Sequence, residues 1–152
     1  MRRFWAVVGL GVFLTLASAA LAQSYKAGEY QVGAPASEPK WRVQARTGST
    51  HAGFAAAADA ASSVDQHLGH ALNCIEGSRG KNFNASWGHV CQGQGEGLLV
   101  DLRADRAGAA WLLVAEAADQ LAVAGIRARD LAQKKNASRG VAELLRLIAE
   151  SR

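Results

Sequence analysis

The sequence predicts an all-α protein, a small antiparallel bundle of three or four helices with a Gly-rich loop that a disulfide closes. Apolar residues recur at every third or fourth position over three segments between residues 50 and 150, as amphipathic helices require. No long stretch alternates between apolar and polar residues, so the sequence offers little from which to build a sheet. The two cysteines, Cys74 and Cys91, bracket part of a glycine-rich stretch.

The N-terminal segment, residues 1–22, has the layout of a secretory signal peptide. Arg2 and Arg3 precede an apolar run from Phe4 to Leu21, and the ending Ala20-Leu21-Ala22 provides the small residues of a cleavage site. The length of the run is near the minimum that spans a bilayer, so an uncleaved membrane anchor is the alternative. We expect cleavage after Ala22, which leaves residues 23–152 as one domain-sized chain.

The charge of the chain argues against a nucleic-acid partner. The sequence has 17 Lys+Arg against 13 Asp+Glu, a net charge of +4, and two of the basic residues belong to the signal peptide. The other basic residues are spread along the chain and form no patch. An Ala- and Arg-rich, Lys-poor composition is typical of bacteria with GC-rich DNA, so we expect a periplasmic or secreted protein. Membrane association is expected only if the signal is retained, and the sequence gives no indication of oligomeric state.

Residues 23–49 are predicted to form an irregular N-terminal arm. They contain both prolines, Pro35 and Pro39, and show no sustained period of 2 or 3.6. Residues 41–45 alternate apolar and polar side chains, which is too short a pattern for a sheet. We expect Trp41 to anchor the arm on the helical domain, which comprises residues 50–152.

The first helix of the domain is predicted over residues 50–76. Ser49 or Thr50 provides the N-cap oxygen, and Gly77 follows the last turn as a C-terminal glycine commonly does. Eight apolar residues with helical spacing form its buried stripe: Phe54, Ala57, Ala61, Val64, Leu68, Ala71, Leu72 and Ile75.

Two further helices are predicted, over residues 106–124 and from residue 129 or 130 to residue 150. The junction at residues 125–128 is short enough to force an antiparallel hairpin. Gly140 is unfavourable in the interior of the last helix, so a bend or break near residues 136–140 is expected there. Residues 98–102 form a short apolar run that is either a helical turn or an extended piece.

The segment from Gly77 to Gly97 is predicted to be an ordered loop. It contains six glycines, but also Phe83, Trp87 and Cys91, which a flexible linker would lack. In an oxidising compartment we expect Cys74 and Cys91 to form a disulfide. Closing a loop of this size stabilises a protein by about 3 kcal/mol.

Histidines near this disulfide suggest a metal or haem site. His67, His70 and Cys74 have helical spacing that places them on one face, and the disulfide brings His89 close to the same face. We therefore predict that His67, His70 and His89 bind copper, zinc or haem iron. His51 is excluded from this set, because on a continuous helix it lies about 24 Å from His67.

Other interpretations of these residues remain open. The histidines are also compatible with a purely structural role, in which they pack and hydrogen-bond to the backbone. A ligand set of Cys74, Cys91 and a histidine would require both thiols to stay reduced and deprotonated. The alternative function is a metal-free periplasmic interaction module that presents the Gly-rich loop to a partner protein. Residues 92–97 resemble a phosphate-binding loop only superficially, since no strand precedes them. No catalytic arrangement is evident, so we do not predict an enzyme.

Overall fold

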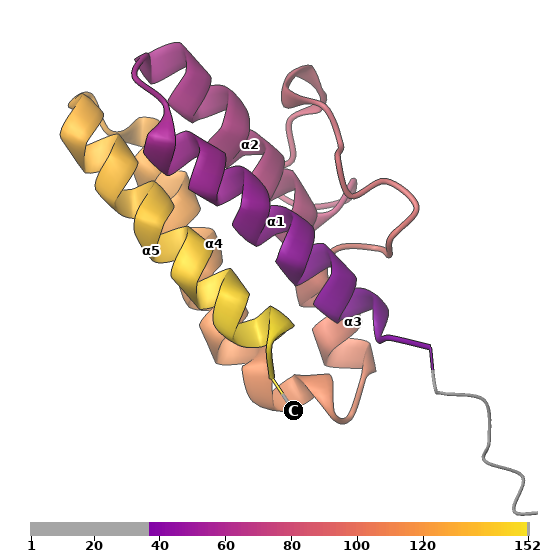
Figure 1. The fold of residues 1–152 in the computed structure, drawn as a ribbon. Helices are drawn as coiled ribbons and strands as arrows, with labels where there is room; N and C mark the ends of the chain where they lie inside the picture. The colour runs from indigo at the N-terminus through magenta and orange to yellow at the C-terminus, as the bar shows by residue number, and fades with distance from the viewer. Residues whose placement is uncertain (1–36, 152) are drawn as a thin grey trace, which may run out of the picture. The chain divides into compact units, whose positions relative to one another are not determined.

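The computed structural model describes residues 37–151. All the regular secondary structure in this range is helical, and it contains no strand (Figure 1). The predicted all-α class is confirmed. The predicted signal peptide, and the predicted arm up to residue 36, lie outside the described residues. Five α-helices and two short 3-10 helices are present in the described part: α1 (Lys40–Ala57), α2 (Ala61–Glu76), η1 (Ala85–Trp87), α3 (Leu98–Ala104), η2 (Gly108–Trp111), α4 (Leu112–Arg127) and α5 (Leu131–Ala149).

The four long helices lie side by side in Figure 1. Helix α1 packs against α2 and α5, and α4 packs against α5 and α2. The short helix α3 packs on the same core, where it contacts α1, α2 and α4. Helices α1 and α4 contribute mainly alanines to the core. The largest fully buried apolar side chains come from α2, α3 and α5: Leu68, Leu72, Ile75, Leu98, Leu102, Leu145, Ile148, Val64 and Val141.

The predicted first helix, residues 50–76, is two helices. The chain leaves helical geometry at residues 58–60, where Ala58 and Ala60 are extended, and α2 returns alongside α1. No glycine or proline marks this turn, so the apolar period runs through it without interruption. The predicted stripe is correspondingly wrong in its first part: Phe54 is exposed, whereas Ala52 and Ala55 are buried.

Residues 40–49, which we predicted to belong to the irregular arm, are helical. Helix α1 begins after Pro39, a residue whose ring favours a position at a helix start. Trp41 is buried in the core as an integral part of this helix, and its Nε1 donates a hydrogen bond to Asp105 Oδ2 at 2.7 Å. The helical domain therefore begins closer to the N-terminus than the sequence suggested.

The hairpin of α4 and α5 differs from the prediction at two glycines, Gly125 and Gly140. Gly125 lies inside α4, which ends at Arg127, and α5 continues unbroken through Gly140. A Cβ at Gly140 would lie 2.6 Å from Leu121 Cδ2, so this glycine permits close approach of the two helices. Residues 108–127 also have the length and apolar composition of a membrane span, but here they pack against α2 and α5.

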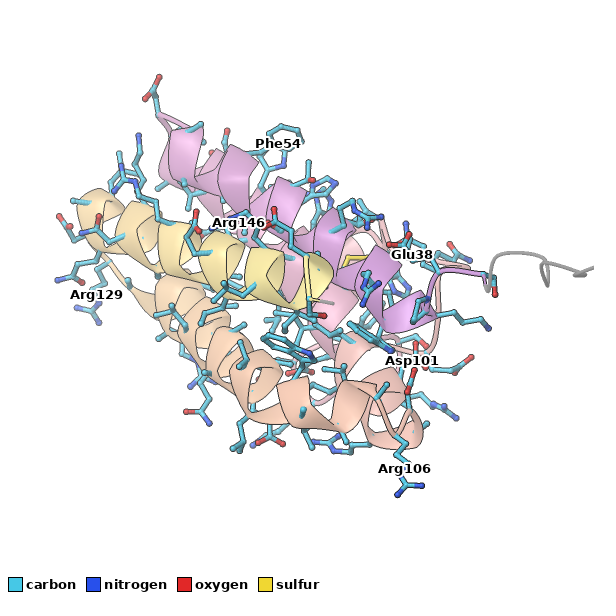
Figure 2. The ribbon with its side chains drawn as sticks, turned by 60° about the horizontal axis from the view of Figure 1, so that its bottom comes forward. Glu38, Phe54, Asp101, Arg106, Arg129 and Arg146 are labelled. Carbon is cyan, nitrogen blue, oxygen red and sulfur yellow. A yellow bond between two sulfur atoms is a disulfide. The ribbon has the colours of Figure 1, made fainter. Side chains whose placement is uncertain are left out.

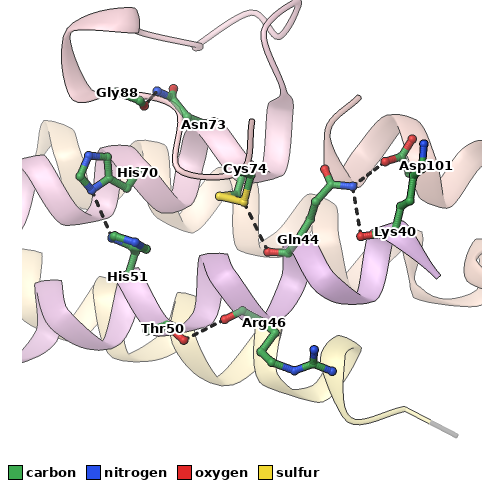
Figure 3. The surroundings of a disulfide bond; sticks show 11 residues. Lys40, Gln44, Arg46, Thr50, His51, His70, Asn73, Cys74, Gly88 and Asp101 are labelled. Carbon is green, nitrogen blue, oxygen red and sulfur yellow. Dashed lines mark hydrogen bonds between the residues drawn. A yellow bond between two sulfur atoms is a disulfide. The ribbon is translucent and has the colours of Figure 1, made fainter. Parts of the chain in front are cut away.

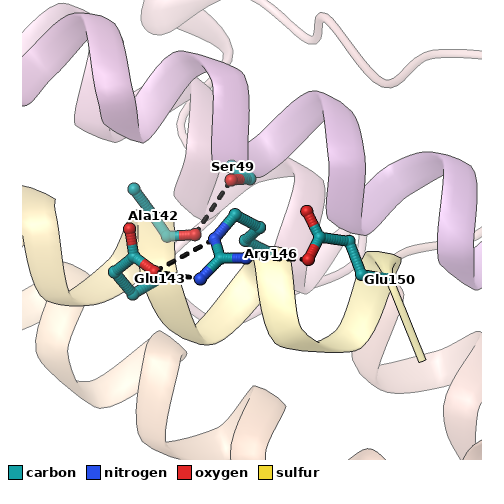
Figure 4. A network of polar contacts seen from close by, with 5 residues as sticks. All are labelled: Ser49, Ala142, Glu143, Arg146 and Glu150. Carbon is teal, nitrogen blue, oxygen red and sulfur yellow. Dashed lines mark hydrogen bonds and ion pairs between the residues drawn. The ribbon is translucent and has the colours of Figure 1, made fainter.

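A hydrogen bond joins α1 to α5, and ion pairs lie along the solvent side of α5 (Figure 4). The Ser49 hydroxyl donates to the Ala142 carbonyl oxygen at 2.8 Å. On the solvent side of α5, Arg146 forms ion pairs with Glu143 and Glu150, both at 2.7 Å. These pairs are exposed, so their contribution to stability is small compared with the buried α1–α5 contact.

The predicted disulfide between Cys74 and Cys91 is present and fully buried. Cys74 lies on the last turn of α2, and Cys91 lies in the segment between α2 and α3, where only η1 is helical. The buried Asn73 amide donates to the Gly88 carbonyl oxygen at 2.6 Å (Figure 3). It also donates to the Asn84 carbonyl oxygen at 2.8 Å, and its oxygen accepts from Asn84 N at 3.0 Å. The segment is therefore held to α2 by a covalent bond and by a buried amide.

Candidate metal centre

Three histidines converge between α1 and α2. His51 comes from α1, and His67 and His70 come from α2. Each offers one nitrogen such that the three nitrogens all lie within 4.8 Å of one another. His51 Nδ1 and His70 Nδ1 form a hydrogen bond at 3.2 Å, which Figure 3 shows bridging the two helices. This group is the only cluster of three or more potential metal ligands among residues 37–151.

The turn at residues 58–60 creates this cluster. His51 and His67 are equally distant in sequence from Asp59, at the middle of the turn, so an antiparallel pair of helices places them at the same level. His70 follows His67 by about one turn on the same face of α2. Our exclusion of His51 was wrong, because the separation of about 24 Å applied to a straight helix, whereas the chain reverses direction.

An aromatic ring covers part of the cluster. The Phe54 ring packs edge-on against the rings of His51 and His67, with centroid distances of 5.6 Å in both cases. Phe54 is 51% exposed, and Figure 2 shows it at the edge of the molecule. All three histidines are half-buried. Phe54 therefore shields the imidazoles from water on one side while it stays accessible on the other.

His67 carries an unsatisfied polar atom. Its Nδ1 is buried and has no hydrogen-bond partner within the described part of the chain. Buried imidazole nitrogens normally have a partner, and no hydrogen-bonding group of residues 37–151 competes for this one. His67 Nδ1 is thus available as a ligand.

His70 is oriented by a contact with the segment that follows α2. The Gln66 amide nitrogen lies 3.2 Å from His70 Nε2 and donates to the Trp87 carbonyl oxygen at 2.8 Å. These contacts fix the ring so that Nδ1 points to His51.

The environment keeps two of these imidazoles neutral. Burial, followed by the charges of His70 and His67, holds the pKa of His51 below its usual value. Burial also lowers the pKa of His70, and His67 adds to this effect, although the Trp87 carbonyl opposes it. Neutral imidazole is the form that binds metal, so His51 and His70 can act as ligands near neutral pH.

The structure brings together two of the three predicted ligands. His67 and His70 lie in one cluster, but His89 lies with its ring against Phe83, at a centroid distance of 5.2 Å, and is not part of the three-histidine group. The disulfide does bring the segment containing His89 to α2, but the backbone directs that side chain elsewhere. The third ligand, His51, becomes evident only once the turn at residues 58–60 is known, because His51 and His67 lie symmetrically about it.

The geometry suits one metal ion with an open coordination position. Two nitrogens bound to one tetrahedral zinc at about 2.0–2.1 Å lie roughly 3.3 Å apart. The 3.2 Å between His51 Nδ1 and His70 Nδ1, a hydrogen bond in this structure, is close to this value, and all three nitrogens lie within 4.8 Å. The cluster contains no carboxylate, and both cysteines are in the disulfide. Comparison of the chain with family models, curated proteins and solved structures found no match in any of the three.

Proposed function

We propose that this protein binds a single divalent transition-metal ion, Zn²⁺ or Cu²⁺, through His51, His67 and His70. The observation that carries this proposal is the convergence of three imidazole nitrogens from two helices within 4.8 Å. The buried, unpartnered His67 Nδ1 supports it independently. Imidazole ligands suit zinc and copper, and a three-histidine site leaves a fourth position for water or an exogenous ligand.

A bare ion fits this cluster better than the haem that the sequence also suggested. A porphyrin fills four positions around its iron and leaves at most two axial positions for protein ligands. Three imidazoles that converge on one point from one side have no place in that arrangement. The ligand set therefore favours an ion without a macrocycle.

Titration of the metal into the full chain tests the proposal. After treatment with a chelator and dialysis, we expect one Zn²⁺ or Cu²⁺ per chain by calorimetry. Replacing His51, His67 or His70 singly by alanine is expected to weaken binding about 10- to 100-fold or more, because each removes one of only three protein ligands. The Cu²⁺ form should show several nitrogen ligands in its electron paramagnetic resonance spectrum.

His89→Ala is the matched control, since it removes the fourth histidine of the chain without touching the cluster. Its metal affinity should equal that of the unmodified protein. If His89→Ala weakens binding while His51→Ala does not, the ligand set predicted from the sequence is the correct one. If no variant changes the affinity, or no metal binds, the interaction module becomes the better description of the protein.

We further propose that the protein is exported to an oxidising compartment. The basic, apolar and small-residue regions of residues 1–22 support this, and so does the buried disulfide, a feature typical of exported proteins. Expression of the full chain in a bacterium, followed by fractionation and intact-mass measurement, tests the proposal. We expect a periplasmic or secreted species that begins at Gln23. A cytoplasmic species that retains Met1 would contradict export.

A further inference from the structure

A cavity with none of the three histidines in its lining lies between α2, the segment after α2, and α4. Its volume is about 320 Å³. Small-molecule sites occupy roughly 300–1,000 Å³, so this cavity has room for a molecule with a single ring but not for a dinucleotide.

The walls of this cavity are apolar. Phe83 and Trp87 come from the segment after α2, whereas Val123 and Ile126 come from the last two turns of α4. Leu72, which is fully buried, forms part of the lining from α2. Two aromatic rings opposite aliphatic side chains favour an aromatic or other flat apolar group as the occupant.

The wall formed by the segment after α2 is held by buried polar groups. Asn73 binds the backbone at Asn84, as described above, and the buried Glu76 carboxylate accepts hydrogen bonds from Asn82 N and Nδ2, both at 2.5 Å. The Trp87 ring lies directly over Gly69, where a Cβ would come within 2.2 Å of Cδ2. The cavity is therefore largely formed before any ligand binds.

The cavity also has a cationic side. Arg127, at the end of α4, lines it, and in the part of the chain that the structure describes Arg127 forms no ion pair. The carbonyl oxygens before it are occupied: the Ala128 amide donates to Ala124 and Gly125, and Lys134 Nζ donates to Ile126. The guanidinium is thus not needed to cap the helix.

An adjoining cavity extends this charged side. It is lined by Lys81, Asn82 and Asp119 as well as by Arg127. Lys81 likewise forms no ion pair among the described residues, and Asp119 pairs with neither cation. No acidic residue lines the apolar cavity itself. An anionic group that enters from this side meets two unpaired cations, Arg127 and Lys81, and one carboxylate, Asp119.

We propose that this cavity binds a small aromatic monocarboxylate. The ring lies between the aromatic rings of Phe83 and Trp87 and the aliphatic side chains of α4, and the carboxylate pairs with the Arg127 guanidinium. A guanidinium presents parallel N–H donors that match a carboxylate, which favours this anion over a neutral amide of the same shape. Asn84 lines the same cavity, and its Nδ2 is a further donor because its Oδ1 already accepts from Ser86.

Calorimetric titration of the full chain with 3-phenylpropionate, and with its neutral amide, tests the proposal. We expect saturable binding of one carboxylate per chain and binding of the amide that is at least about tenfold weaker. Arg127→Gln should weaken binding of the carboxylate by a similar factor. Val123→Phe, which fills the cavity, should abolish binding while Arg127 stays in place.

Arg129→Gln is the matched control, because Arg129 has the same charge close by in the sequence, lines neither cavity and projects from the molecule in Figure 2. It should bind as the unmodified protein does. Nuclear magnetic resonance of the unmodified protein should show ligand-induced shifts at the Asn82 and Asn84 side-chain amides. Equal binding of acid and amide, shifts centred elsewhere, or no saturable binding up to about 10 mM carboxylate would overturn the proposal.

Discussion

Asp119 shows how a single residue lowers the stability of this protein at neutral pH. It is half-buried on α4, and burial, followed by the charge of Glu76, raises its pKa from 3.8 to about 6. The folded protein therefore binds this proton more tightly than the unfolded chain. Stability consequently decreases as the pH rises from about 4 to about 6, and it remains at the lower value above pH 6.

We predict that Asp119→Asn increases the free energy of unfolding at pH 7.5 and leaves it unchanged near pH 3.5. The expected gain is about 1 kcal/mol, because half-exposure screens the full effect of the pKa shift. Urea unfolding at the two pH values measures it. Asp59→Asn removes the same charge from a fully exposed side chain and serves as the control. Equal gains from both variants would attribute the effect to net charge.

At the scale of the helices, periodicity predicted where apolar stripes occur but not where the chain turns. Helix α5, predicted from residue 129 or 130 to residue 150, follows from the sequence almost to the residue, and the structure adds Asp130 as its N-cap, which accepts from Gln133 N. The turn at residues 58–60 could not be predicted, because alanine-rich sequence on both sides gives no local signal for it. The packing of α1 on α2 and α5 determines that turn, and the missing histidine ligand was a direct result of missing it.

Two helical glycines with opposite surroundings allow a matched test of this packing. A Cβ at Gly69 would overlap Trp87, whereas at Gly53 it would meet nothing within 4 Å. We predict that Gly69→Ala destabilises the protein by about 1–3 kcal/mol and displaces Trp87. Gly53→Ala should stabilise it by up to about 1 kcal/mol, because alanine favours the helix. Urea unfolding of both variants decides this, and a stable Gly69→Ala with unchanged Trp87 fluorescence would contradict it.

Gly69→Ala also tests the link between packing and the metal centre. The carbonyl of Trp87 helps to orient His70 through Gln66, so displacement of Trp87 should weaken metal binding. We expect a loss of about tenfold, within the range for indirect ligand support. Gly53→Ala provides the control again, since the orientation of His70 does not depend on it. Equal metal affinities of the two variants would show that the segment after α2 does not help to position the histidines.

At the scale of the whole molecule, the disulfide and the metal centre act on neighbouring parts of α2. His70 and Cys74 are one turn apart, and Cys91 Sγ lies 3.9 Å from the Gln44 carbonyl oxygen of α1 (Figure 3). The disulfide fixes the segment after α2, while the proposed metal ion would join α2 to α1 through His70 and His51. Both constraints oppose unfolding of the same part of the chain.

We predict that the double variant Cys74→Ala, Cys91→Ala loses about 3 kcal/mol of stability, as expected for opening a loop of this length. Saturating Zn²⁺ should recover part of this loss, about 2.7 kcal/mol at a hundredfold excess over Kd. Thermal unfolding with and without metal measures both effects. Addition of a chelator should reverse the gain in stability. If Zn²⁺ still stabilises the double variant after His51→Ala is added to it, the metal acts at another site.

The turn at residues 58–60 also determines which changes of chain length the metal centre can tolerate. An insertion between His51 and the end of α1 would rotate His51 by about 100° and carry it away from α2. An insertion within the turn itself would leave both helices in place and the cluster intact. Length variation in this hairpin should therefore be confined to the turn, and a related chain that departs from this pattern should lack the metal centre.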